Sequence, residues 1–589
     1  MRFVLPVLAA ILPVVITPGF LFYFDVTPKV LIVLIGVAVA LLFWRGELPT
    51  GSRMNRAFLA LLAAEAVALA ICTALSTHPA LSLTGGNWRR FGLVSQIAVL
   101  LFAMLVALDC SSDRNRVAVY LKAMVAGGVP VALYAVLQYF GWDPLLPKQS
   151  YHSGDFSWSI IRPPSTMGHA SYLATYLVAV VFCCAALFRM RMWRGMAMAT
   201  AVLCSGAIVL SGTRAALLGL AAGAIFALVL LRVRVHMRPA IGVAVGLLVA
   251  LGVFYWSPAG QPIRNRVTWS SMEPLGGARP LLWRDSLRMS LHHPVFGYGP
   301  ETFLADFPRF ESRDLARAYP DFEHESPHNI FLDALLSTGL LGTAILALFC
   351  LWGIRASRNW PVLGAALVAV ITAQLFTSFV LPTAFFFFMI LALMVEQSEI
   401  RRVPLARFAG ACCAVLLAAF AARLFVSDQA LASASAALGR GDFAAADRAW
   451  QRSQIWALPG AGSDLYYSRR LAEFASASRD FRTKALALRQ GFGAAARAPR
   501  TSDEPANAWY NLAAFESLTN SAPDVERSLQ YSIAAAPNWY KPHWVLAQLY
   551  VAEHRMQDAR KEAEIAADLN GNEPQVARTL EKIRDAERQ

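Results

Sequence analysis

The chain has 589 residues, of which 57% are hydrophobic and only 16% are charged, whereas soluble domains carry about 25% charged residues. A water-soluble fold cannot bury this much apolar side chain, so the composition predicts a polytopic membrane protein surrounded by lipid. The net charge of +14 could suggest binding to nucleic acid, but many Lys and Arg residues lie in short loops between apolar runs. Membrane orientation explains that placement better, and no nucleic-acid partner is predicted.

Thirteen apolar runs are long enough, or nearly so, to cross a hydrocarbon core of about 30 Å. They lie at 3–24, 28–44, 57–76, 91–108, 117–140, 168–188, 196–211, 215–231, 240–256, 329–352, 361–380, 384–395 and 408–426. Several are short, so about 12 to 14 spans are expected. Because a second apolar run follows at once, we interpret the first run as an uncleaved span and not as a signal peptide.

Alternate loops differ in charge. If the N-terminus is cytoplasmic, the loops on that side carry sixteen Arg residues, and the short loops on the other side carry six Lys or Arg residues. This bias follows the positive-inside rule and predicts a cytoplasmic N-terminus in a bacterial inner membrane. The long loop 257–328 and the tail 427–589 are then periplasmic. All eight Cys lie in or at the ends of apolar runs, so no disulfide framework is expected.

The tail becomes Ala-rich and charged, with a helical pattern. Residues 512–538 align with residues 546–570, and residues 437–459 form a third, looser unit. The spacing resembles tetratricopeptide repeats, although any array of helical hairpins would look similar. We therefore expect a transmembrane domain over 1–426 and a helical repeat domain over 427–589.

Stacked helix pairs leave a concave face that usually binds a partner. Trp539, Tyr540 and Trp544 either line such a face or pack between repeats. A protein partner on the repeats is one expectation from this pattern.

Polar segments occur at the predicted outer ends of the spans. They read THPALSLTGGNWRRFG (77–92), RPPSTMGHASYLATY (162–176), SGTRA (211–215), RPLLWRDSLRMSLHHPVFGYGPETF (279–303) and DFEHESPHN (321–329). A single Arg there would commonly extend into lipid headgroups. Several on one leaflet favour an anion instead, because guanidinium groups bind phosphate oxygens in pairs.

The last polar segment holds the most informative histidines. His328 immediately precedes an apolar run, where it could be a helix-entry residue, a general base or a hydrogen-bond donor. Together with Asp321, Glu323, His324 and Glu325, His328 could also be read as part of a divalent-metal cluster. Alternating acids are common in solvated loops, however, and neither a metal nor a cofactor is predicted.

The order of these motifs, GGNWRR, STMGHASYLATYL, SGTRA, RPLLW with PVFGYGP, and PHN with GLLG, resembles the O-antigen ligase superfamily. This superfamily includes O-antigen polymerases and bacterial protein O-oligosaccharyltransferases, and the resemblance covers roughly residues 75–395. It implies an all-helical membrane glycosyltransferase that needs no metal. Its members move a glycan from undecaprenyl pyrophosphate to an acceptor hydroxyl outside the cytoplasmic membrane, and some carry helical repeats after the last span.

The resemblance also implies roles for arginines. Arg214 in SGTRA and Arg279 in RPLLW match arginines that hold the donor pyrophosphate. Either Arg89 or Arg90 matches an earlier arginine, and the doubled residue leaves the choice open. Arg284, one turn beyond Arg279, is a secondary candidate for the same role.

Three histidines receive candidate roles in the same way. His328 in PHN matches the histidine implicated in activating the acceptor hydroxyl. His169 stands where the family often has an Asn-containing stretch, so its role is open, and His324 is a further secondary candidate.

The resulting hypothesis is an inverting transfer of glycan to lipid A–core or to protein Ser or Thr. The alternative is a polymerase that joins lipid-linked repeat units. A lipid-linked sugar transporter is less well supported because no internal halves are visible in the membrane domain. A scaffold without chemistry would leave the outer Arg and His residues unexplained.

Overall fold

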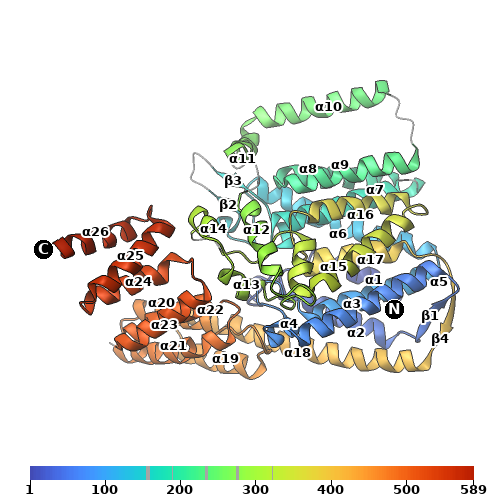
Figure 1. The fold of residues 1–589 in the computed structure, drawn as a ribbon. Helices are drawn as coiled ribbons and strands as arrows, with labels where there is room; N and C mark the ends of the chain where they lie inside the picture. The colour runs from blue at the N-terminus through green and yellow to red at the C-terminus, as the bar shows by residue number, and fades with distance from the viewer. Residues whose placement is uncertain are drawn as a thin grey trace.

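The computed structural model describes residues 1–153, 159–188, 190–232, 237–272, 277–320, 323–519 and 521–588. Regular structure in these residues is almost entirely α-helical (Figure 1). Its strands form two antiparallel pairs: β1 (Glu47–Thr50) with β4 (Glu399–Arg402), and β2 (His152–Ser153) with β3 (Ile160–Ile161). The predicted all-α fold class is confirmed.

Apolar helices form a bundle. Among the described residues, eight helices are long and apolar enough to cross a membrane. They are α3 (Arg53–Ala74), α5 (Leu93–Ser112), α6 (Asn115–Tyr139), α7 (Ala170–Leu187), α8 (Arg194–Leu210, preceded by the 3-10 turn Arg191–Trp193), α9 (Arg214–Leu231), α15 (Ile330–Ala356) and α18 (Pro404–Gly439). Shorter or more separate apolar helices are α2 (Thr27–Leu42), α16 (Pro361–Gln374), α17 (Leu381–Leu393) and α10 (Met237–Trp256).

Each of the thirteen predicted runs contains a helix, but the first run is not one continuous helix. The run 3–24 holds only α1 (Val4–Ile11). Pro13 lacks an amide hydrogen, and its ring would clash with the carbonyl group four residues earlier. Gly19 then adopts a φ of +77°, which an L residue rarely adopts. The prediction of a single helical span at 3–24 is therefore wrong.

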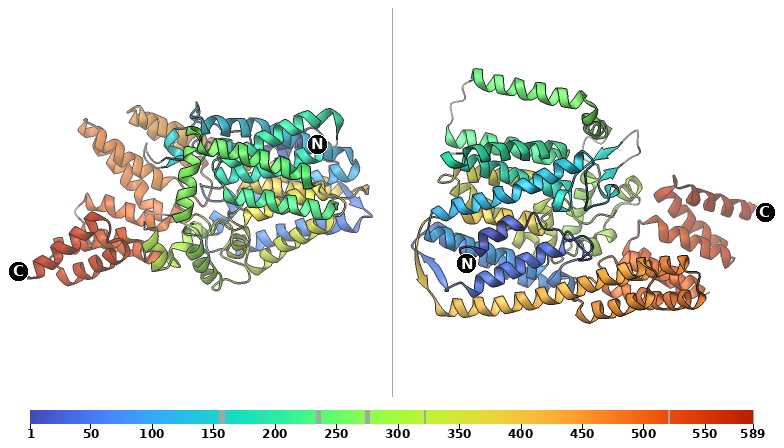
Figure 2. Two further views of the ribbon diagram at one scale, coloured as in Figure 1. Left: turned by 90° about the horizontal axis from the view of Figure 1, so that it is seen from above. Right: turned by 180° about the vertical axis from the view of Figure 1, so that it is seen from behind.

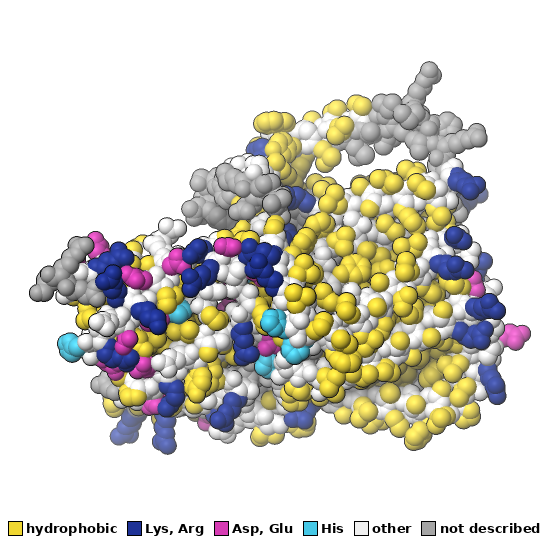
Figure 3. Space-filling model, viewed as in Figure 1, with side chains coloured by type: hydrophobic (Ala, Val, Ile, Leu, Met, Phe, Trp, Pro, Cys, Tyr) yellow, Lys and Arg dark blue, Asp and Glu magenta, His cyan; other side chains and the backbone are white. Residues whose placement is uncertain are grey.

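The bundle has two distinct ends. We call the end next to the C-terminal helices the repeat end, and the end that carries β1 and β4 the far end (Figures 1 and 2). Hydrophobic side chains cover the flank of the bundle between these ends, and Lys and Arg gather at the rim of the far end and over the repeats (Figure 3). This distribution is the one expected for a helical bundle that crosses a bilayer.

The long loop 257–328 is folded and lies at the repeat end. It contains α11 (Gln261–Met272), α12 (Arg279–Ser290), α13 (Phe303–Asp306) and α14 (Arg313–Ala318), with 3-10 turns at Pro258–Gly260 and Phe307–Arg309. At the same end lie α4 (Pro79–Thr84) and the 3-10 turns Lys148–Ser150 and Ser165–Met167. These short elements bring together the polar segments that separate the spans in sequence.

The C-terminal region is an array of paired helices. After α18 come α19 (Phe443–Trp456), α20 (Asp464–Ala477), α21 (Phe481–Thr501), α22 (Pro505–Ser517), α23 (Ala522–Ala535), α24 (Tyr540–Ala552), α25 (Met556–Asn570) and α26 (Pro574–Arg588). Successive helices pack in pairs from α18 with α19 to α24 with α25. Ala513 and Ala547, which the sequence alignment equates, are both buried where helices cross. The predicted boundary at 426/427 lies inside α18, so one helix joins the bundle to the repeats.

The three aromatic residues at the start of α24 have different environments. Tyr540 is 4% exposed and packs between elements. Trp544 donates its Nε1 hydrogen to Thr579 Oγ1 at 2.9 Å in the last helix. Trp539 lines a cavity between the repeats and the long loop. Tyr540 and Trp544 therefore pack between helices, whereas Trp539 lines a cavity.

Polar contacts fasten the repeats to the long loop. Arg317 in α14 donates from Nη2 to both carboxylate oxygens of Asp568 in α25, at 2.5 and 2.6 Å. Asn538 donates from Nδ2 to the Glu311 carbonyl oxygen at 2.6 Å. The long loop and the repeats thus form a continuous surface at the repeat end.

Candidate active site

Four arginines from four separate segments line one pocket at the repeat end, which we call the arginine pocket. Arg162 precedes α7, Arg214 begins α9, Arg266 lies in α11 and Arg279 begins α12. The pocket has a volume of about 270 Å³, and no Asp or Glu is among its described lining residues. The described walls of the pocket therefore concentrate positive charge.

The electrostatics of the arginine pocket favour an anion. Desolvation, followed by the charges of Arg266 and Arg279, lowers the pKa of Arg162 to about 10. Desolvation, followed by the charges of Arg214 and Arg279, lowers the pKa of Arg266 to about 10. With pKa values near 10, Arg162 and Arg266 remain protonated at neutral pH, and an anion in the pocket would relieve the repulsion between the guanidinium groups.

The hydrogen-bond donors of the arginine pocket also favour an anion as its ligand. Arg162 approaches Ser171 Oγ from Nη2 at 3.5 Å, and its buried Nε has no hydrogen-bond partner within the described part of the chain. Arg214 and Ala215, the first two residues of α9, line the pocket. The amides that begin a helix have no partner within the helix and carry partial positive charge, so they attract phosphate groups.

The predicted catalytic His328 lies beside this pocket and not in its wall. Trp283, which does line the pocket, donates its Nε1 hydrogen to the Pro327 carbonyl oxygen at 2.8 Å. His328 has a φ of +51° and places Nδ1 3.3 Å from Ser326 Oγ. Asn329 then begins α15 by accepting hydrogen bonds from the Phe331 and Leu332 amides. A non-glycine residue in this left-handed conformation stores strain, which is frequent at functional sites.

His169 occupies a comparable position at the start of α7. Its Nδ1 accepts a hydrogen bond from the Ser171 amide at 3.1 Å, and its side chain is exposed. Desolvation, and then the charge of Arg279, lower the pKa of His328 to about 4. The His328 imidazole is therefore neutral at pH 7 and able to accept a proton.

The structure does not bring Arg89 and Arg90 to the arginine pocket. Arg89 is buried, with Nε 3.0 Å from Glu301 Oε1 and Nη1 3.3 Å from Asp333 Oδ2. Arg90 lies 3.2 Å from Asp428 Oδ1, and its guanidinium group stacks over the Tyr23 ring. These pairs connect the loop before α5 to the long loop, to α15 and to α18, and carboxylates engage both guanidinium groups.

The two secondary candidates also lie elsewhere. Arg284 forms ion pairs with Asp285 and Asp314, each at 3.0 Å. His324 is buried, and its Nε2 lies 3.8 Å from Glu311 Oε1 in the wall of the cavity next to the repeats. Among the described residues, no three His, Cys, Asp or Glu side chains are grouped so as to hold a metal ion. Asp321, part of the metal alternative, lies outside the described residues.

The sequence interpretation missed two members of the pocket as site residues. Arg162 stood in a quoted polar segment but was counted only as a loop charge. Arg266 lies in the middle of the long loop, in a stretch without a motif. Only the fold shows that these two arginines meet Arg214 and Arg279.

Comparison with known families bears on this same region. Residues 199–347, which include three of the four pocket arginines and His328, match a family model described as O-antigen ligase. The predicted resemblance is confirmed here. The match to O-antigen ligases spans about a quarter of the chain and supports a membrane enzyme of ligase or polymerase type.

Other comparisons add less. No curated protein matches the chain. A solved structure, "Crystal structure of APC/C hetero-tetramer Cut9-Hcn1", is similar at 12% identity, covering 82% of this chain and 76% of that chain with a TM-score of 0.21.

Proposed function

We propose that the protein transfers a glycan from undecaprenyl pyrophosphate to an acceptor hydroxyl. The observation that supports this most directly is the arginine pocket, in which four guanidinium groups converge without an acidic side chain in the described walls. Arg matches the planar, bidentate geometry of phosphate oxygens, and its charge persists at all physiological pH values. A pyrophosphate group is the anion that the O-antigen ligase match suggests for this pocket.

The arginine pocket would act on the leaving group. As the sugar–phosphate bond breaks, negative charge grows on the departing pyrophosphate. Preplaced guanidinium groups stabilise that charge more in the transition state than in the bound donor, which is what accelerates a reaction. In this scheme Arg279, beside the segment that carries His328, lies closest to the chemistry.

The acceptor side of the reaction would use His328. Its neutral imidazole takes the hydroxyl proton as the acceptor oxygen attacks the anomeric carbon. Attack opposite the leaving group forms the new glycosidic bond with inversion, and the pyrophosphate departs on its lipid. Because the charge of Arg279 helps to lower the pKa of His328, a bound pyrophosphate would offset that charge and raise this pKa. Donor binding would thus strengthen the base.

We assign the repeat end to the periplasm and the far end to the cytoplasm. The far end includes Arg45, next to β1, and Arg401, in β4, in agreement with the positive-inside rule. The acceptor would then be lipid A–core or a protein Ser or Thr outside the inner membrane. The repeats favour a separate acceptor, because a folded surface stands beside the long loop.

The test is the chain length of lipid-linked glycan in a strain that lacks the protein, measured by mass spectrometry. Accumulated multi-repeat chains are expected, because polymerisation continues while final transfer is lost. Single repeat units would overturn ligation in favour of polymerisation, and an unchanged pool would overturn both. Complementation with Arg279→Gln should fail, whereas Arg288→Gln, an exposed position on the same helix, should restore the native pool.

A further inference from the structure

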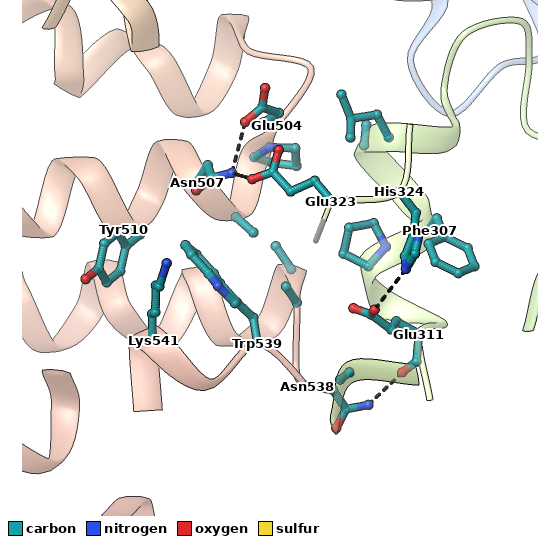
Figure 4. Close-up of a pocket in the computed structure, with 18 of the residues that line it drawn as sticks. Phe307, Glu311, Glu323, His324, Glu504, Asn507, Tyr510, Asn538, Trp539 and Lys541 are labelled. Carbon is teal, nitrogen blue, oxygen red and sulfur yellow. Dashed lines mark hydrogen bonds and ion pairs between the residues drawn. The ribbon is translucent and has the colours of Figure 1, made fainter. Parts of the chain in front are cut away.

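A second cavity lies between the long loop and the repeats, and we call it the junction cavity. Phe307, Glu311 and His324 line it from the loop, and Tyr510 and Trp539 line it from the repeats (Figure 4). Its volume is about 320 Å³, within the range of roughly 300–1,000 Å³ that is usual for small-molecule sites. It is separate from the arginine pocket and shares no lining residue with it.

The polar groups of the junction cavity form a mixed set of donors and acceptors. Asn507 donates from Nδ2 to Glu323 and, at 2.9 Å, to Glu504 Oε2. Arg469 donates to Asn507 Oδ1 at 3.3 Å, and Lys541 adds a second basic group to the lining. Acidic and basic side chains are thus interleaved, which suits a ligand with many hydroxyl groups better than one of high charge.

Burial keeps two of the carboxyl groups partly protonated. Desolvation, with a contribution from Asp285, raises the pKa of Glu311 to about 8. Desolvation, followed by the charges of Glu323 and Asp503, raises the pKa of Glu504 to about 7. A protonated carboxyl group both donates and accepts hydrogen bonds, as a hydroxyl group requires of its partner.

Aromatic rings supply the apolar part of the junction cavity. Trp539 is half-buried, and its ring centroid lies 5.0 Å from that of Tyr510 at an interplanar angle of 59°. Figure 4 shows both rings on the repeat side, with Trp539 between Tyr510 and the loop residues His324 and Glu311. A pyranose ring has an apolar face of C–H groups and a rim of hydroxyl groups. The combination of a Trp face with Glu and Asn side chains matches both features.

In sequence, one wall of the junction cavity lies close to the proposed reacting centre. His324 lines the cavity, and His328 follows four residues later. Four extended residues span at most about 14 Å. A saccharide chain whose end reacts near His328 could therefore reach the junction cavity with its more distant sugars.

We propose that the junction cavity is a saccharide-binding subsite that holds sugar residues remote from the bond being made. The assignment of those sugars to the enzyme's own substrate rests on the proposed function. The donor glycan and a glycan acceptor share the required chemistry, and the experiment below separates them.

The test is binding of two free saccharides to the purified full-length protein in detergent, measured by calorimetry. The first is the glycan that mild acid releases from the lipid-linked pool, and this free glycan lacks pyrophosphate. The second is deacylated core oligosaccharide. We expect Trp539→Ala to weaken one of these interactions at least tenfold, and Trp539→Phe and Glu504→Gln to weaken it less. Trp544→Ala is the matched control, because Trp544 lies on the same helix and contacts Thr579 instead.

The saccharide that binds identifies the source of the sugars. The proposal is overturned if neither saccharide binds the native protein, or if Trp539→Ala binds the saccharide as tightly as the native protein does. Arg279→Gln separates this proposal from the proposed function, because free saccharide lacks pyrophosphate and its affinity should not change. Saccharide binding that depends on Trp539, together with full transfer by Arg279→Gln, would refute the proposed function alone.

Discussion

Arg279→Gln tests the arginine pocket most directly, because it removes one charge and keeps a hydrogen-bond donor. A hydrogen bond to a charged group contributes about 1.5–3 kcal/mol and a neutral one about 0.5–1.5 kcal/mol. Exchanging the first for the second should therefore cost about 1–1.5 kcal/mol, an affinity loss for inorganic pyrophosphate of about 5- to 13-fold. The same change should not destabilise the free protein. The charge of Arg279 lowers the pKa of both Arg162 and Arg266, so its removal relieves repulsion within the pocket.

The assay is titration calorimetry of the full-length protein with sodium pyrophosphate, combined with thermal unfolding. Arg288→Gln is the control, since Arg288 is exposed on the same helix and lies 3.7 Å from Asp285. Affinity should fall with added salt in the native protein, and less steeply in Arg279→Gln. Equal affinity in native protein and Arg279→Gln, or an equal loss in Arg288→Gln, would refute the reasoning.

Three further predictions follow from single positions. His328→Ala should abolish transfer and leave membrane insertion and pyrophosphate affinity near native; since the pKa of His328 is lowered to about 4 in the free protein, the native kcat/KM, which reports the free enzyme, should stay flat between pH 6 and 8, and a midpoint near 6.5 in that profile would contradict this role. Gly168→Ala should destabilise the fold by about 1 kcal/mol or more, because Gly168 has a φ of +81° and a Cβ would lie 2.4 Å from Asp25 Oδ2; a native-like unfolding temperature would argue against this strain. Asp568→Asn should weaken the exposed pair with Arg317 and speed hydrogen exchange in the last repeat helices while transfer continues, and unchanged exchange would show that other contacts hold the repeats.

The sequence predicted most of the fold because hydrophobic periodicity and length decide where apolar helices form. It failed where local chemistry overrode hydropathy, as at Pro13 in the first run. It also placed the boundary of the repeats at the end of the apolar stretch, although α18 continues to Gly439 without a break. Hydropathy indicates where an apolar segment leaves the lipid, but the helix that contains this segment can continue beyond that point.

The site was predicted less completely. Arg214 and Arg279 were expected to act together, and the structure brings them into one pocket. Either Arg89 or Arg90 was expected to join them, but both form ion pairs, with Glu301 and Asp428, which are far away in sequence. No local pattern shows which arginine will meet a carboxylate, since such ion pairs depend on the tertiary fold.

The single helix α18 has a mechanical consequence. Its 36 residues correspond to about 54 Å of helix at 1.5 Å per residue, whereas the hydrocarbon core is about 30 Å thick. A continuous helix of that length fixes the orientation of the repeats relative to the bundle, which a flexible linker cannot do. The array of helix pairs is therefore held at a fixed height and orientation beside the bundle.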